Sequence, residues 1–86
     1  MVTSSKVKSI CMDIISLAIS KSETTKSDIF VKYFPHTSEI DIEIYPNGFK
    51  DINSYCEYYY FNLSENDIKE KLENVLSKLK EIKGED

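Results

Sequence analysis

Residues 39–45, Glu-Ile-Asp-Ile-Glu-Ile-Tyr, alternate strictly between isoleucine and polar side chains. Successive side chains of a strand point to opposite faces, so this pattern predicts a strand with Ile40, Ile42 and Ile44 buried together. The acids between them then lie on a face that looks to solvent or to a partner. A sheet of this kind needs a second layer to cover its apolar face.

Two more strands flank this one in the sequence. Residues 28–34 are β-branched and aromatic and are stopped by Pro35, which predicts a strand there. Residues 55–63 predict a third strand, but their aromatic side chains fall on both faces, and the pattern leaves open which parity points inward. The Pro-Asn-Gly segment at 46–48 predicts a turn after the central strand.

Helical periodicity marks the two ends of the chain. Apolar residues recur at helical spacing from about 5 to 21, and again from about 65 to 83. For the second helix, Ser64 is expected to act as the N-cap, with Asp67 in the return position of a capping box. Its apolar stripe comprises Ile68, Leu72, Val75, Leu76, Leu79 and Ile82, and is expected to pack on the chain's own sheet rather than in a coiled coil.

These elements predict an α+β fold with the order α-β-β-β-α, two layers, and a three-stranded antiparallel sheet with both helices on one face. At 86 residues, the chain is expected to form a single domain spanning 1–86. With 41% hydrophobic and 30% charged residues, its composition is that of an ordinary globular protein.

Other classes of protein are disfavoured by what the sequence contains. No apolar run approaches the roughly 20 residues of a membrane span, and the first residues lack signal-peptide character, so we expect a cytoplasmic protein with no membrane partner. Cys11 and Cys56 match no metal or redox spacing and are interpreted as free thiols. No metal site and no cofactor are expected.

An enzyme is also not expected. His36, the only histidine, follows Pro35 in a turn with no nucleophile motif near it. The sequence holds no glycine-rich phosphate loop, and Asp41 and Glu43 lie on one strand rather than across a cleft.

Negative charge is concentrated in the middle of the chain. Residues 36–67 hold seven acids and one lysine, whereas residues 1–35 hold five lysines and three acids, and residues 68–86 hold five of each. The middle third therefore carries more negative charge than the net −4 of the whole chain.

This segment predicts an acidic surface with tyrosines embedded in it, suited to a lysine- or arginine-rich site on another protein. The expected partner-binding residues are Glu39, Asp41, Glu43, Tyr45, Asp51, Glu57, Tyr58 and Tyr60. The plainer interpretation is a solvated strand face, because alternation alone demands polar residues there, with Lys32 paired across from the acids.

Two protein families share this order of elements. Double-stranded RNA-binding domains hold phosphates with lysines at the start of their second helix, where this chain has Ser64-Glu65-Asn66-Asp67, so direct binding of nucleic acid is not expected. In layout, small size, acidity and tyrosine-bearing strands, the whole chain resembles small phage anti-CRISPR proteins, some of which imitate DNA. That resemblance implies that residues 39–60 do the imitating.

The resemblance implies a phage or mobile-element inhibitor that occupies the basic nucleic-acid or PAM-reading site of a host defence nuclease. Its partner is then a Cas nuclease or another nucleic-acid-binding host protein. The alternative is a non-enzymatic homodimeric or adaptor module that uses the apolar strand edge at 58–61 or the C-terminal helix.

Overall fold

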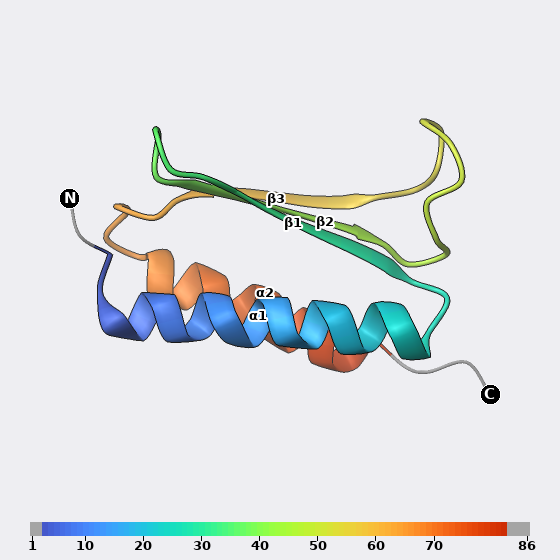
Figure 1. Cartoon of the computed structure of the whole chain (residues 1–86), viewed down its shortest axis with the longest axis horizontal. Coiled ribbons are helices and arrows are strands. Elements are labelled where there is room, and N and C mark those ends of the chain that lie inside the picture. The colour runs from blue at the N-terminus through green and yellow to red at the C-terminus, as the bar shows by residue number, and fades with distance from the viewer. Residues whose placement is uncertain (1–2, 83–86) are drawn as a thin grey trace.

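The computed structural model describes residues 3–82, and two helices lie against one face of a three-stranded sheet (Figure 1). In chain order the elements are α1 (Ser5–Thr24), β1 (Asp28–Phe34), β2 (Glu39–Tyr45), β3 (Glu57–Asn62) and α2 (Ile68–Glu81). The predicted α+β class and the order α-β-β-β-α are therefore confirmed.

The sheet has the order β1-β2-β3, and both neighbouring pairs are antiparallel. Ile42 at its centre lies opposite Val31 on one side and Tyr59 on the other, and all three pack toward the helices. Because side chains alternate along a strand, Tyr58 and Tyr60 point away from the helices. The register of β3 therefore shows which of its aromatic side chains point toward the core, a point that the sequence pattern left open.

The core fills the space between the sheet and the helix pair. The three isoleucines of β2 lie over α1 and α2, and Ile14, Leu72 and Leu79 are fully buried beneath them. Each such side chain contributes about 1.5–3 kcal/mol by leaving water. The apolar stripe of α2 is thus used within the chain itself, as the sequence indicated. The buried core comprises Val7, Ile10, Ile14, Ile40, Ile42, Ile44, Ile68, Leu72, Val75 and Leu79.

Helix α1 runs to Thr24, three residues beyond the end expected from apolar periodicity. The hydroxyl of Thr24 donates to the carbonyl of Ser20, and that of Thr25 donates to the carbonyl of Lys21. These side chains satisfy carbonyls of the last turn, so a polar composition alone does not end the helix.

Helix α2 begins at Ile68, and the prediction that Ser64 caps it is wrong. The side-chain oxygen of Asn62 accepts a hydrogen bond from the backbone N–H of Ser64 at 2.8 Å and another from its hydroxyl. This local turn occupies the serine, and the N-cap position falls to Asp67, whose side chain makes no capping hydrogen bond.

The turn after β2 is as expected and is fixed by Gly48. Its N–H donates to the carbonyl of Tyr45 at 2.9 Å, and its φ of +88° lies in the region that favours glycine. A Cβ at this position would lie 3.1 Å from the carbonyl oxygen of Lys26, so the turn also packs closely against the chain before β1.

Candidate partner-binding surface

One face of the sheet, here called the open face, points away from both helices (Figure 1). The acids of β2 form an acidic row along its middle, defined as Glu39, Asp41 and Glu43. Lys32 flanks this row on the β1 side, and Tyr60 on the β3 side. The whole face comprises Asp28, Phe30, Lys32 and Phe34 of β1, Glu39, Asp41, Glu43 and Tyr45 of β2, and Tyr58, Tyr60 and Asn62 of β3.

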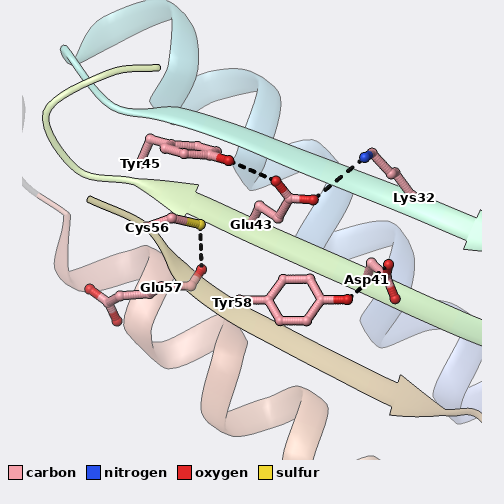
Figure 2. Close-up of polar contacts among 7 residues, drawn as sticks. All are labelled: Lys32, Asp41, Glu43, Tyr45, Cys56, Glu57 and Tyr58. Atoms are coloured by element: carbon pink, nitrogen blue, oxygen red, sulfur yellow. Dashed lines mark hydrogen bonds and ion pairs between the residues drawn. The ribbon is translucent and has the colours of Figure 1, made fainter. Parts of the chain in front are cut away.

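Tyrosine hydroxyls reach diagonally across the strands to the acidic row. Tyr58 lies opposite Glu43 in the register but donates to Oδ2 of Asp41 at 3.1 Å (Figure 2). Tyr60 lies opposite Asp41 and in the same way donates to Glu39. Each phenol is therefore held in place by a carboxylate, and the ring of Tyr58 lies along the sheet surface (Figure 2).

Glu43 has two partners of its own. The hydroxyl of Tyr45 donates to its Oε1 at 2.9 Å, and the Lys32 ammonium lies 3.5 Å from its Oε2 (Figure 2). Lys32 stands directly opposite Asp41 in the register, yet its ammonium reaches Glu43. Among residues 3–82, Oδ1 of Asp41 is buried and accepts no hydrogen bond. The acidic row is thus only partly matched by positive charge of the chain.

These contacts shift the ionisation of both partners. The hydrogen bonds from Thr37 and then from Tyr60 lower the pKa of Glu39. The hydrogen bond to Glu39 raises the pKa of Tyr60 to about 12, and desolvation followed by the bond to Asp41 raises the pKa of Tyr58. At neutral pH the ionised carboxylate of Glu39 therefore lies beside the protonated phenols of Tyr58 and Tyr60.

An aromatic cluster closes one end of the open face. Phe30, Tyr45 and Phe49 meet edge to face, with ring centroids 5.1–6.0 Å apart. The loop that carries Phe49 is tied down because the Phe49 N–H donates to Oδ2 of Asp28 at 2.8 Å. At the tip of this loop Ile52 is 94% exposed. The face therefore ends in apolar side chains next to its carboxylates.

Most of the residues predicted to bind a partner lie together on this face, and two do not. Asp51 lies in the loop after β2 and accepts a hydrogen bond from the Asn53 N–H. Glu57 faces the helix side, where it accepts from the Tyr59 hydroxyl at 3.2 Å and lies 3.5 Å from the Lys78 ammonium. Those brought together are Glu39, Asp41, Glu43, Tyr45, Tyr58 and Tyr60.

The sequence did not predict that β1 and the loop after β2 add aromatic side chains to the open face. Phe30 alternates with Ile29 and Val31, a signal that places it on the face opposite to the core. The part played by Phe49 had no comparable signal, because its position depends on how the loop folds back onto the sheet.

The histidine, cysteine and acidic side chains within residues 3–82 form no group of three or more that is arranged to hold a metal ion. His36 is exposed in the turn between β1 and β2. Cys56 lies at the end of the open face, where its thiol donates to the carbonyl of Glu57 at 3.5 Å (Figure 2). No helix in the described part of the chain has the length and apolarity to cross a membrane.

Comparisons of the chain with protein-family models, with curated proteins and with solved structures give no match.

Proposed function

We propose that the protein is a non-enzymatic binding module whose open face occupies a cationic, nucleic-acid-binding site on another protein. The observation that carries this proposal is charge: four carboxylates and one lysine share a sheet face that no helix covers. Because ionised side chains on a sheet repel one another, such a face gains from an incoming positive surface.

Arginine is the best complement to this face. A guanidinium binds a carboxylate through two parallel hydrogen bonds and also stacks on an aromatic ring. Asp41 lies at the centre of the acidic row, and Tyr58 and Tyr60 lie beside it on β3. An arginine that enters here meets both kinds of contact at once.

The distance between neighbouring charges in the acidic row can be compared with the distance between phosphates in DNA. Alternate residues of a strand are about 7 Å apart, whereas one strand of a DNA duplex carries a charge about every 3.4 Å along its axis. The row therefore has about half the linear charge of a DNA strand. This supports competition for part of a phosphate-binding site rather than imitation of an extended duplex.

The specific form of the proposal is a phage or mobile-element inhibitor of a host defence nuclease, acting in the host cytoplasm in the manner of an anti-CRISPR protein. The partner is then a Cas nuclease or another nucleic-acid-binding protein, and the site is its phosphate- or PAM-reading surface. Direct binding of nucleic acid by this face is disfavoured because its carboxylates repel phosphates.

The test reverses charge at the centre of the face. The double variant Asp41→Lys with Glu43→Lys is expected to weaken binding to an oligoarginine peptide by about tenfold or more, a size typical of close charge pairs across an interface. The same loss is expected for any purified Cas nuclease that binds the wild type. Wild-type affinity should fall as salt rises. Isothermal titration calorimetry at two salt concentrations measures both effects.

The matched control is Glu73→Lys with Glu81→Lys, which makes the same change in net charge on exposed positions of α2. It is expected to retain most of the affinity, because these residues lie on the other side of the molecule. Equal loss in both variants would mean that net charge alone drives binding and would refute the assignment to the open face. Oligolysine should bind more weakly than oligoarginine of equal length, because lysine does not stack.

A further inference from the structure

A second apolar stripe on α1 is left uncovered by the core. The buried side of the helix uses Val7, Ile10, Ile14 and Ala18. Met12, Ile15 and Ile19 follow one another at helical spacing on a different side and are 69%, 44% and 55% exposed. A monomeric protein of this size gains nothing from a row of large apolar side chains in water.

No strand of residues 3–82 pairs with the edge of the sheet above this stripe, although α1 already uses one of its backbone N–H groups. β1 is an outer strand, and the backbone N–H of Ile29 donates away from β2, to Oγ of Ser22 at 3.1 Å. Because hydrogen-bonding direction alternates along an antiparallel strand, the N–H and C=O groups of Val31 and Tyr33 point to the same open edge. The outward backbone groups of Val31 and Tyr33 can serve as a template for pairing with another strand, and Lys32 between them points to the open face.

Two hollows of about 410 and 390 Å³ lie side by side between α1 and β1, and the first also reaches Ile40 of β2 and Leu63. Ile15 and Val31 line both of them and so mark the middle of the groove. One hollow is also lined by Lys8, Met12 and Tyr33, and the other by Ile19, Glu23 and Ile29. The groove is therefore apolar along its length, with a positive residue toward one end and a negative residue toward the other.

This arrangement is self-complementary. A two-fold axis at Val31 pairs β1 with β1 of a second copy in antiparallel fashion, so that each Val31 lies opposite its equivalent. The same axis, passing near Ile15, brings Met12 of one copy toward Ile19 of the other, since both lie about equally far from the centre. Lys8 and Glu23 are also equally spaced about that centre, and each then meets the opposite charge.

We propose that two copies of this chain form a symmetric dimer through the β1 edge and the Met12, Ile15 and Ile19 stripe of α1, with Lys8 of each copy paired with Glu23 of the other. The side that carries α1 and β1 faces the viewer in Figure 1, and the molecule measures 42 × 24 × 17 Å. A standard interface buries about 800 Å² on each partner, about a seventh of the 5880 Å² surface of this chain, which such a side accommodates. The product is a continuous six-stranded sheet with two open faces side by side.

Charge reversal tests this pairing without disturbing the core, because Lys8 and Glu23 are both exposed. Wild-type protein is expected to sediment at twice the 10.0 kDa chain mass at high micromolar concentration. Lys8→Glu alone or Glu23→Lys alone places like charges opposite each other twice in the dimer and is expected to raise the dissociation constant about tenfold. The double variant Lys8→Glu with Glu23→Lys should restore it.

Two more variants distinguish dimerisation through this interface from non-specific hydrophobic association. Ile15→Asp is expected to abolish dimerisation, whereas Ile52→Asp, at a loop tip and even more exposed, should leave it unchanged. A wild-type chain that stays monomeric throughout would overturn the proposal and would leave the groove to a strand of another protein. A dimer that dissociates equally in the single and double charge variants, or that Ile52→Asp disrupts, would also overturn it.

Discussion

At the scale of single residues, Asp41 is the most informative position on the open face. It lies between two other acids on β2, and Lys32, which stands opposite it, pairs with Glu43 instead. One of its carboxylate oxygens accepts no hydrogen bond from the described residues. Its charge is therefore the least compensated of the acidic row. In a binding protein this is the position where loss of charge should affect affinity most while affecting folding least.

The variant Asp41→Asn removes that charge and keeps the shape of the side chain. Its amide oxygen can still accept from Tyr58, so the free energy of unfolding is expected to stay within about 0.5 kcal/mol of wild type. Affinity for oligoarginine should fall several-fold. Urea denaturation and calorimetry measure the two quantities, and an unchanged affinity would show that Asp41 does not contact the cation.

The phenols of the open face should titrate late. The bond to Glu39 raises the pKa of Tyr60 from its ordinary 10.0 to about 12, and the pKa of Tyr58 is raised as well. A group that holds its proton more tightly when folded contributes stability in full below pH 10, and that contribution is lost as pH rises through about 12. Stability should therefore fall between these values.

Ultraviolet difference absorbance of tyrosinate follows this titration, and Tyr60→Phe provides the control. Removing Tyr60 should delete part of the late-titrating absorbance and reduce the fall in stability over the same pH range. If the late part of the curve is identical in wild type and variant, the hydrogen bond from Tyr60 to Glu39 does not form in solution.

At the scale of elements, the turn after β2 controls how the aromatic end of the open face is built. Gly48 adopts a φ that only glycine adopts easily, and the chain then folds back so that Phe49 meets Phe30 and Tyr45. The turn thus connects backbone geometry to the shape of the candidate surface.

Gly48→Ala should cost about 1–3 kcal/mol, because the side chain forces a left-handed conformation and its Cβ meets the carbonyl of Lys26 at 3.1 Å. Thermal denaturation measures the loss. Asn47→Ala, at the exposed neighbouring position, is the comparison and should cost much less. Equal effects in the two variants would contradict the strain assigned to Gly48.

The sequence predicted element boundaries well where the hydrophobic periodicity is strong. It did not predict the boundaries that depend on local hydrogen bonds. The alternation of β2 gave its bounds and its buried isoleucines, since a period of two admits one interpretation. The start of α2 was misplaced because Asn62 competes for Ser64, and the end of α1 because hydroxyl side chains prolong the helix. Periodicity carries no information about either contact.

At the scale of the whole molecule, alternation predicted that the acids of β2 share a face, but not what else lies there. The parity of β3 required the register, which turns Tyr58 and Tyr60 outward and Glu57 toward Lys78. The contribution of Phe49 depends on a loop whose path the sequence does not specify. Composition indicated a negative middle segment, and only the fold shows which of its charges lie side by side.

The central claim is that the open face is where a cationic partner binds. Titration of isotope-labelled protein with oligoarginine, followed by NMR of the backbone amides, tests it most directly because it locates the contact without any mutation. The largest shifts are expected in β2 and β3 around Asp41, Glu43, Tyr58 and Tyr60, and they should shrink as salt is added. Shifts that gather on α2, or that spread evenly over all exposed acids, would contradict the claim.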